Sequence, residues 1–301
     1  MKSTVVGAIC LSLAASIWGG MYVVSKYVLE EIPPMTLVWL RYVIGLVVLM
    51  TLVKWSTRKQ KVMITKRDWG LFVWIGFIGY FVSIACQFIG TKLSDAHTGA
   101  LITSATPAFM VLFARFILHE ALTIRKGLSL ILATGGVVIV VGVDKNLGSE
   151  HVGSWILVLA AVTWALLSVY VKVAAKRHSS LTITTYAILF ACLFTTPFMM
   201  MEMSRVGIGE LDGLIIFGVL YLGIVSTAGA FFLWNKGLEL MDAGVGSLFF
   251  FFQPIVGAFF GWLLLNEVLE ASFFVGALFI VAGVVIATWV KKERKEVVFK
   301  A

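Results

Sequence analysis

Residues 95–120 read DAHTGALITSATPAFMVLFARFILHE, and residues 242–267 read DAGVGSLFFFFQPIVGAFFGWLLLNE. The second stretch repeats the first at a constant spacing of 147 residues, which pairs Pro107 with Pro254. Both stretches open on Asp-Ala, carry Gly and Leu at equal spacings, and close on Glu. Self-similarity of this kind is typical of a chain built from copies of one structural unit. The sequence therefore predicts two copies of one unit.

The composition around the repeat is typical of a membrane protein. Of the 301 residues, 60% are hydrophobic and 13% are charged, and the mean hydropathy is +1.00. A soluble domain with so much apolar surface would aggregate. The charged residues cluster between apolar runs close to the roughly 18 to 20 residues that cross the hydrocarbon core as a helix. The net charge of +8 is then explained by membrane topology, so no nucleic-acid partner is expected.

The sequence predicts an all-α integral membrane protein with ten transmembrane helices. Charged residues and Gly/Pro clusters delimit these spans, which are 5–28, 35–53, 69–89, 98–118, 127–143, 153–174, 181–201, 214–234, 246–265 and 273–289. Five spans fall in the first repeat, 1–145, and five in the second, 146–301. Because five is an odd number, the second repeat enters the membrane from the opposite side, and the two five-helix repeats are inverted.

The distribution of Lys and Arg supports this inversion. With the amino terminus in the cytoplasm, the predicted cytoplasmic segments hold 18 Lys and Arg residues, and the outer loops and helix ends hold 4. Basic residues are retained on the cytoplasmic side during insertion. We therefore expect a multi-pass protein of the bacterial cytoplasmic membrane with both termini in the cytoplasm. The apolar amino-terminal stretch is interpreted as an uncleaved first helix.

An aromatic face on span one recurs on span six. Trp18 and Tyr22 share one face of a helix, and Trp164 and Ser168 occupy the equivalent positions 146 residues later. We interpret these four residues as part of the lining of a central cavity. Ordinary packing of aromatic side chains in a helix bundle is the alternative that the sequence leaves open.

Pro107 in span four and Pro254 in span nine each remove a backbone donor. The carbonyls of Thr103 and Phe250 then lack their normal helical partners, and in hydrocarbon such groups must be satisfied by protein or by water in a cavity. Polar side chains lie beside both prolines, namely Thr103, Ser104, Thr106 and Gln253. Paired interruptions at equivalent depths favour a central binding site. Kinks that serve only the curvature of the helices are the alternative.

Three further polar side chains lie within predicted spans. Tyr80 and Gln87 belong to span three, and Arg41 belongs to span two without a basic counterpart in span seven. Such groups are costly at membrane depth unless they face the bundle interior. Arg41 could bind the carboxylate or phosphate of a solute through its planar fork. Lys26, near the same outer end, could assist, although extension of its side chain to the membrane interface is the simpler interpretation.

Other kinds of site find little support in the sequence. No predicted span carries Asp or Glu at its middle, which weakens the case for an intramembrane carboxylate as a proton relay. The four His residues lie near helix ends without the spacing of metal ligands, and the three Cys residues lie in apolar runs. We therefore expect no metal, no cofactor and no catalytic residue.

These motifs resemble those of the EamA family of the drug/metabolite transporter superfamily. The resemblance covers nearly the whole chain and rests on WGGMYVVSK at 18–26, LRY around Arg41, GALITSATPAFMVLFARFILHEALT from Gly99, the Trp164 segment, WNKGLELMDAGVGSLFFFFQPIVGAFFGWLLLNEVLE from Trp234, and GALFIVAG from Gly276. It implies inverted five-helix repeats and a central cavity lined mainly by helices one, three, four, six, eight and nine. It also implies a cycle of alternating access.

From these observations we predict a secondary transporter that exports a small organic metabolite, amino-acid-like, across the cytoplasmic membrane. The aromatic lining would accept an apolar side chain, and Arg41 or backbone groups near the prolines would hold a charged end. A membrane enzyme acting on lipid-linked groups and a passive small-solute channel are the alternatives. Membrane lipid is an expected partner. The sequence leaves open the identity of the solute, the coupling ion and whether the protein forms a homodimer.

Overall fold

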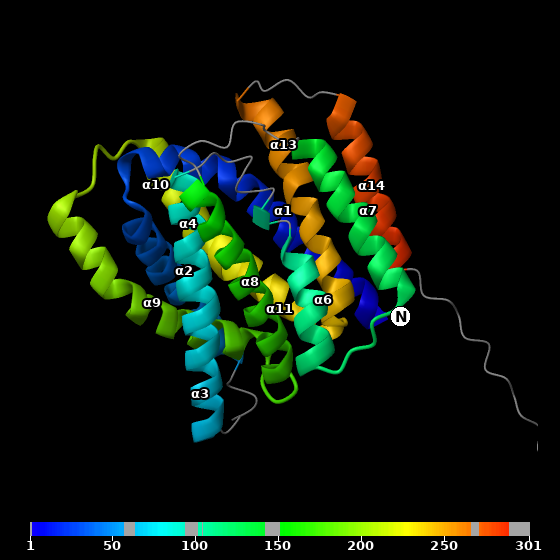
Figure 1. Ribbon diagram of the computed structural model, residues 1–301. Coiled ribbons are helices and arrows are strands. Elements are labelled where there is room, and N and C mark those ends of the chain that lie inside the picture. Colours follow the sequence, from blue (N-terminus) through cyan, green and yellow to red (C-terminus); the bar gives the residue numbers. More distant parts are fainter. Residues whose placement is uncertain are drawn as a thin grey trace, which may run out of the picture.

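The computed structural model describes residues 2–56, 64–93, 102–103, 105–141, 151–265 and 271–288. Throughout these residues the regular elements are helices, without a strand (Figure 1). Two of them, η1 and η2, are π-helical, and η3 is a 3-10 helix. In chain order the elements are α1 (Lys2–Glu31), α2 (Pro34–Ser56), α3 (Lys66–Ile75), η1 (Gly76–Ser83), α4 (Ile84–Leu93), α6 (Thr106–Ile117), α7 (Ile124–Val141), α8 (His151–Ala174), α9 (Ser180–Arg205), α10 (Gly213–Leu220), η2 (Tyr221–Gly229), α11 (Ala230–Leu240), α12 (Ala243–Gly246), η3 (Ser247–Phe251), α13 (Phe252–Leu265) and α14 (Ala271–Thr288).

Six helical segments are long and apolar enough to cross a membrane. They are α1, α2, α3–η1–α4, α8, α9 and α10–η2–α11, and they coincide with predicted spans one, two, three, six, seven and eight. The other four predicted spans correspond to α6, α7, α12–η3–α13 and α14, which are shorter or interrupted. Residues 98–101 of predicted span four lie outside the described residues. The predicted all-helical membrane fold is confirmed, whereas the boundary between residues 145 and 146 stays a prediction.

The paired prolines lie at paired helix starts. α6 begins at Thr106 with Pro107 in its first turn, and α13 begins at Phe252 with Pro254 in its first turn. The first turn of a helix leaves its N–H groups without intrahelical partners, so proline is tolerated there. The 3-10 helix η3 leads into α13. The interruptions predicted from the sequence are therefore changes of helix type and fresh helix starts, and not bends in continuous α-helices.

Two π-helical segments, which the sequence did not reveal, occupy equivalent positions in the repeats. η1 lies in the middle of span three and η2 in the middle of span eight. The carbonyls of Tyr80 and Ser226, 146 residues apart, each accept a hydrogen bond from an aromatic side chain of another helix. Tyr42 Oη donates to the first, and Trp18 Nε1 donates to the second at 3.1 Å. Such π-helical turns are frequent at functional sites.

Equivalent helices of the two repeats run in opposite directions. The segment α10–η2–α11 crosses the bundle, and Asp212 at its start accepts a hydrogen bond from Tyr27 near the end of α1 at 3.0 Å. At its other end, the carbonyl of Leu238 accepts a hydrogen bond from Lys172 near the end of α8 at 3.1 Å. Because α1 and α8 are equivalent and finish at opposite ends of one helix, the arrangement agrees with inverted repeats.

The bundle has two ends, which are named after Glu31 and Glu120. The Glu31 end holds the ends of α1 and α9 and the starts of α2 and α10, and there Thr36 N donates to a carboxylate oxygen of Glu202 at 2.8 Å. The Glu120 end holds the ends of α6 and α8 and the starts of α3 and α12, and there Ala243 N donates to Glu120 at 2.7 Å. Each end is therefore joined by hydrogen bonds between helices that are far apart in the sequence.

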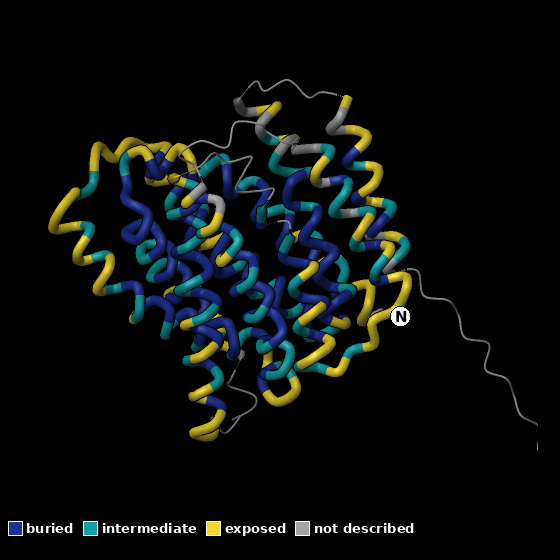
Figure 2. Tube along the Cα trace, viewed as in Figure 1, coloured by how far each residue is buried: buried dark blue, intermediate teal, exposed yellow. Residues whose placement is uncertain are grey.

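The helices α7 and α14 lie side by side at one edge of the bundle (Figure 1). They pack closely, since a Cβ atom on Gly136 would lie 2.6 Å from the carbonyl oxygen of Gly276. Buried residues concentrate in the middle of the bundle, away from this edge (Figure 2). The largest fully buried side chains include Trp234, Arg41 and Tyr80. The polar and aromatic centre of the bundle is therefore where a binding site is sought.

Candidate functional site

A pocket in the middle of the bundle is lined by residues of both repeats, and concave sites between the helices of a bundle are common places for small molecules to bind. Its walls come from α1, α2, η1–α4, α6 and the residues just before it, α8, α11, η3 and α13. The lining residues are Trp18, Met21, Arg41, Ser83, Ile84, Gln87, Thr103, Thr106, Ala160, Ala161, Trp164, Phe231, Phe250 and Gln253. Both repeats therefore contribute to one cavity.

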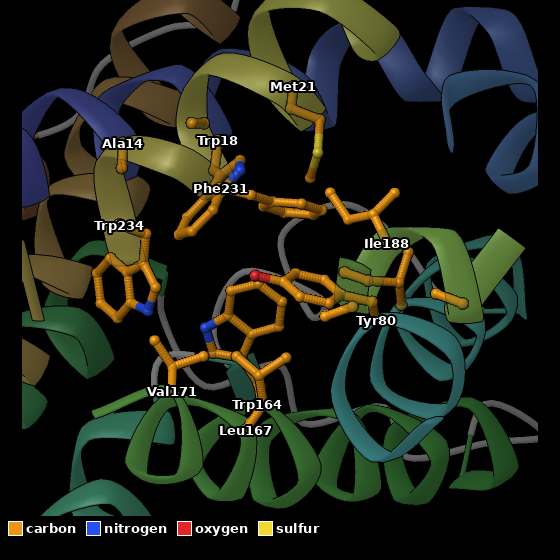
Figure 3. Packing of buried hydrophobic residues seen from close by; sticks show 14 of the residues in the cluster. Ala14, Trp18, Met21, Tyr80, Trp164, Leu167, Val171, Ile188, Phe231 and Trp234 are labelled. Carbon is orange, nitrogen blue, oxygen red and sulfur yellow. The ribbon is translucent and has the colours of Figure 1, made fainter. Parts of the chain in front are cut away.

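Four aromatic side chains form the wall of the cavity nearest the Glu120 end, called the aromatic floor: Trp18, Trp164, Phe231 and Phe250. Trp18 lies at its centre, with its ring 5.3 Å from that of Trp164, 5.6 Å from that of Phe231 and 5.9 Å from that of Phe250. Figure 3 shows three of these rings with their neighbours. The equivalent tryptophans of the two repeats therefore contact each other edge to face, an arrangement that favours the aromatic quadrupoles.

A second layer of side chains seals the far side of the floor. Trp234 is fully buried, and its Nε1 donates to Ser168 Oγ at 3.1 Å while its ring packs 5.3 Å from Phe250. We call Ser168, Trp234 and Phe250 the aromatic trio. The Tyr80 hydroxyl points toward the same group (Figure 3) and accepts a hydrogen bond from Asn235 at 2.9 Å. The path toward the Glu120 end is therefore closed by packed rings.

The opposite side of the cavity carries a polar counterpart. Gln87 Nε2 donates to Tyr22 Oη at 2.6 Å, and Tyr22 Oη shares a further hydrogen bond with Thr103 Oγ1 at 3.2 Å. We call these residues the polar trio. Tyr22, Gln87 and Thr103 are the repeat equivalents of Ser168, Trp234 and Phe250, at spacings of 146, 147 and 147 residues. The two trios therefore use the same three helical positions on opposite sides of the cavity.

Arg41 brings a positive charge into this cavity. Its side chain is fully buried, with Nε donating to Thr227 Oγ1 at 2.7 Å and Nη2 donating to Ser226 Oγ at 3.3 Å, both within η2. The guanidinium carbon lies 5.3 Å from the ring centre of Phe88 and 5.6 Å from that of Phe231. Within the described residues no carboxylate forms an ion pair with Arg41. A buried cation in contact only with neutral groups is an attractive partner for an anionic ligand.

Three buried polar atoms on the cavity wall lack a hydrogen-bond partner among the described residues: Thr106 Oγ1, Gln253 Oε1 and Trp164 Nε1. Thr106 and Gln253 are repeat equivalents, and each directly precedes a proline at a helix start. Buried polar atoms normally have partners. A ligand can therefore donate to Gln253 Oε1 and to the Thr106 hydroxyl, and it can accept from Trp164 Nε1. The Thr106 hydroxyl can also donate.

Glu120 joins the two repeats at the Glu120 end. Its carboxylate accepts hydrogen bonds from the backbone N–H of Ala243 at 2.7 Å and of Gly244 at 3.1 Å, and it pairs with Lys126 at 3.1 Å. Burial by itself raises the pKa of this carboxyl group, but the two backbone donors and Lys126 outweigh it, so the pKa lies below its ordinary value. Nearby, Lys172 donates to the carbonyls of Leu238 and Met241. This end is therefore held shut by charge-assisted bonds.

The cavity gathers seven of the side chains proposed from the sequence: Trp18, Arg41, Gln87, Thr103, Trp164, Phe250 and Gln253. Five others lie just outside its lining, because they support it from behind or terminate helices: Tyr22, Tyr80, Pro107, Ser168 and Pro254. Ser104 lies outside the described residues. The role of all these residues in binding stays a prediction. Lys26 is exposed and does not line the cavity with Arg41.

Several lining residues were not found from the sequence. Phe231 and Met21 lie on helices whose aromatic and polar members had been singled out. Thr106, by contrast, was noted from the sequence as a polar group beside Pro107, and it lines the cavity. Phe231 carried no such signal, since it lies in an apolar run where periodicity does not separate lipid-facing positions from cavity-facing ones.

Comparison with known proteins gives a consistent result. The model of the EamA-like transporter family matches residues 5–142 and again residues 151–289. Two relatives from Bacillus subtilis are named as uncharacterized transporters. YetK is 28% identical over 95% of this chain and 87% of its own, and YoaV is 24% identical over 98% and 100%. A crystal structure superposes with a TM-score of 0.76 at 21% identity, covering 94% of this chain and 96% of the other.

Proposed function

The chain belongs to the EamA-like transporter family, and from this premise we propose that it is a secondary transporter that exports a small amino-acid-like metabolite by alternating access. The solute binds in the central cavity between the two repeats. Its carboxylate contacts Arg41, its apolar side chain packs on the aromatic floor, and its amino group donates to Gln253 and Thr106. The protein is a multi-pass membrane protein, and we place it in the cytoplasmic membrane with both termini inside, as the distribution of Lys and Arg favours.

The observation that carries this proposal is the environment of Arg41. A fully buried guanidinium lines an otherwise mostly apolar cavity and contacts only neutral partners among the described residues. A planar guanidinium matches a carboxylate, with two parallel N–H donors. A monocarboxylate of modest size with an apolar body satisfies both the charge and the rings.

Alternating access follows from the difference between the two sides of the cavity. The packed rings of the aromatic floor and the bonds of Glu120 support a state closed at the Glu120 end, which is the cytoplasmic end in the proposed topology. The opposite state requires the polar trio to close the Glu31 end while the floor opens. The π-helical segments η1 and η2 border both trios and supply carbonyls whose partners can change. A floor of packed rings also favours a carrier over a passive channel.

Counterflow in proteoliposomes tests this proposal. Labelled amino acids with apolar side chains are offered to vesicles loaded with the same unlabelled compound, and we expect saturable exchange for at least one of them. Competition by the free acid, by its amide and by the amine without a carboxyl group isolates the role of the carboxylate, and only the free acid should compete well. Absence of saturable counterflow across the whole panel would contradict transport of this class.

The variant Arg41→Gln sharpens the same test. Removing one partner of a buried charge pair costs about 2 to 5 kcal/mol, so we expect counterflow to fall by about 30-fold or more. Arg41→Lys keeps the charge and loses the planar fork, so its counterflow rate should lie between those of the wild type and Arg41→Gln. Lys26→Gln is the matched control, because Lys26 is an exposed cation on α1 outside the cavity. Equal competition by the acid and the amide in the wild type would remove Arg41 from the site.

A further inference from the structure

We propose that Arg41 binds a small inorganic anion of the chloride class whenever the solute is absent, so that net transport exchanges the solute carboxylate for that anion. This inference rests on the proposed function, because the anion occupies the place of the solute carboxylate. It adds a second ligand to the site and identifies a co-substrate for the return step of the cycle. Three features of the cavity and one argument about the transport cycle support it.

The first feature is a permanent charge. An arginine side chain is not deprotonated in proteins, and that of Arg41 is fully buried. Its three hydrogen-bond partners are Thr227 Oγ1 at 2.7 Å, Ser226 Oγ at 3.3 Å and Met21 Sδ at 3.6 Å. All three are neutral, and the described residues contain no carboxylate paired with Arg41. Among the described residues this charge therefore has no counter-ion.

The second feature is unused donor capacity. The guanidinium has five N–H groups, of which three serve the hydroxyl and thioether partners of Arg41. Among the described residues, one N–H on each terminal nitrogen has no partner and is available to a ligand. The rings of Phe88 and Phe231, 5.3 Å and 5.6 Å from the guanidinium carbon, provide cation–π contact. Ring faces stabilise a cation without neutralising it, so the part of the chain that the structure describes still supplies no negative charge to the site.

The third feature is the set of other donors on the same cavity wall. Trp164 Nε1 can only donate, and it has no partner among the described residues. The hydroxyl of Thr106 is likewise unpaired there and can donate. Gln253 Oε1 is an unpaired acceptor in the same cavity, which suits the amino group of a solute and not an inorganic anion. An inorganic anion can therefore be held by Arg41 and these donors without Gln253, whereas the amino group of the solute also uses the Gln253 acceptor.

The fourth argument is what the buried charge of Arg41 means for the return of the empty carrier. A solute that is a zwitterion with a neutral side chain contributes no net charge, yet its carboxylate lies against Arg41 while it is bound. After release, the empty carrier would have to return with a bare buried guanidinium, and burying an uncompensated charge is strongly unfavourable. An anion taken from the compartment that has received the solute removes this penalty. Net export is then faster when that compartment contains a small anion.

Two transport assays on the full chain in proteoliposomes separate this inference from the proposed function. Counterflow, with solute on both sides, uses only solute-loaded states and needs no anion. Net efflux into solute-free medium requires the return step, and it is measured with chloride or with a bulky sulfonate outside. We expect chloride to accelerate net efflux by about tenfold or more and to leave counterflow unchanged. Because exchange of a zwitterion for chloride moves one net charge, potassium and valinomycin are present on both sides to carry the compensating charge, and radioactive chloride should enter the vesicles as the solute leaves.

The outcomes are distinguishable. Equal net efflux in chloride and in sulfonate, without chloride entry and with normal counterflow, would overturn the anion site and leave the proposed function standing. Absence of counterflow would overturn the proposed function and the anion site together. Lys26→Gln, an exposed cation outside the cavity, should keep the chloride dependence. Arg41→Gln should show the same slow net efflux in both media.

A binding measurement keeps the inference testable if Arg41→Gln transports too little to measure. The thermal unfolding midpoint of the detergent-solubilised protein is compared in chloride and in the bulky sulfonate at equal ionic strength. A ligand that binds the folded state raises this midpoint. We expect a rise for the wild type and for Lys26→Gln, and none for Arg41→Gln. A rise of equal size in all three would contradict binding at Arg41.

Discussion

The polar trio and the aromatic trio occupy equivalent positions in the two repeats, yet they differ in chemistry. In the first repeat a Gln side chain donates to a Tyr hydroxyl at 2.6 Å, and in the second a Trp side chain donates to a Ser hydroxyl at 3.1 Å. The donor comes from span three or eight and the acceptor from span one or six in both cases. The third member is Thr103 beside the polar pair and Phe250 beside the aromatic pair.

This difference indicates how an inverted duplication acquires direction. Hydroxyl and amide groups can exchange protein partners for water at modest cost, since net contributions of single hydrogen bonds are about 0.5 to 1.5 kcal/mol. Packed tryptophan and phenylalanine rings exclude water and lose much more when they separate. In the aromatic trio only Phe250 lines the cavity, with Ser168 and Trp234 packed behind it, whereas Gln87 and Thr103 of the polar trio both line it. Each of the following predictions alters one side of this comparison.

Trp234→Ala is expected to have the largest effect, because it removes the largest ring of the aromatic trio. Trp234 is fully buried and contacts Trp18 and Phe250 with ring distances of 5.4 Å and 5.3 Å. Truncating a buried tryptophan costs about 3 to 5 kcal/mol. We expect a lower thermal unfolding midpoint in detergent and a leak of solute that does not saturate.

Trp234→Phe is the control for that change. It keeps a ring in the seal and loses only the donor to Ser168, so we expect a cost of about 1 kcal/mol and saturable transport without a leak. A sealed, saturable Trp234→Ala protein would show that the aromatic trio does not close the path.

Glu120→Ala tests the bonds that hold the same end shut. The carboxylate serves two backbone N–H groups and Lys126, and we expect a loss of about 1 to 3 kcal/mol. Because the pKa of Glu120 is lowered in the folded protein, its contribution is present above the ordinary carboxyl pKa of 4.5 and is lost as the pH falls through the lower, folded value. Between pH 6 and 8 Glu120 should therefore cause no change in the unfolding midpoint of the wild type. The difference in unfolding midpoint between the wild type and Glu120→Ala should disappear only in strong acid.

Glu120→Gln keeps an acceptor and loses the charge, so its unfolding midpoint should lie between those of the wild type and Glu120→Ala. A gap that closes already between pH 6 and 8 would show that the group titrates near neutrality and is not a fixed anchor. In that case the sealed end would depend on proton concentration in the physiological range.

The sequence was sufficient for the fold but only partly for the site. Hydropathy and the repeat spacing determine the number and direction of the helices, because each span must satisfy its own backbone in lipid. The π-helical segments were not predictable, since their hydrogen bonds depend on tertiary partners such as Tyr42 and Trp18. Arg41 could be selected as a costly intramembrane charge, whereas its neutral partners Thr227 and Ser226 lie 185 or more residues away. Contacts over such distances leave no periodic signal in the sequence.

Gly19→Ala tests how close α1 must lie to the second repeat. A Cβ atom on Gly19 would be 2.6 Å from the carbonyl oxygen of Gln253, which is backbone and cannot rotate away. The equivalent position in the second repeat is Ala165, which is fully buried with its methyl group in place. We therefore expect overpacking in the first repeat only, with a cost of about 1 to 3 kcal/mol and slower counterflow because Trp18 is displaced.

Gly20→Ala is the neighbouring control for that change. Its Cβ atom would first meet the Tyr221 hydroxyl at 3.3 Å, at the far end of a side chain, so a much smaller effect on the unfolding midpoint is expected. Equal loss in Gly19→Ala and Gly20→Ala would indicate a general intolerance of α1 to added methyl groups and would remove the distinction between the repeats at this position.

Tyr22→Phe should have the smallest effect on stability and the most specific effect on transport. The change keeps the ring and removes one hydroxyl, which accepts from Gln87 at 2.6 Å and shares a hydrogen bond with Thr103 at 3.2 Å. We expect a cost of about 0.5 to 1.5 kcal/mol, because water in the cavity can solvate the freed amide of Gln87. Ser168→Ala is the matched change in the aromatic trio, where the Trp234 side chain is fully buried and neither Trp234 nor Ser168 lines the cavity. It should therefore cost more stability than Tyr22→Phe while changing the Michaelis constant for counterflow less. The reverse order, with Tyr22→Phe the more destabilising and Ser168→Ala the more harmful to solute affinity, would mean that the ligand contacts the aromatic side of the pseudosymmetric pair and that the polar trio is the seal.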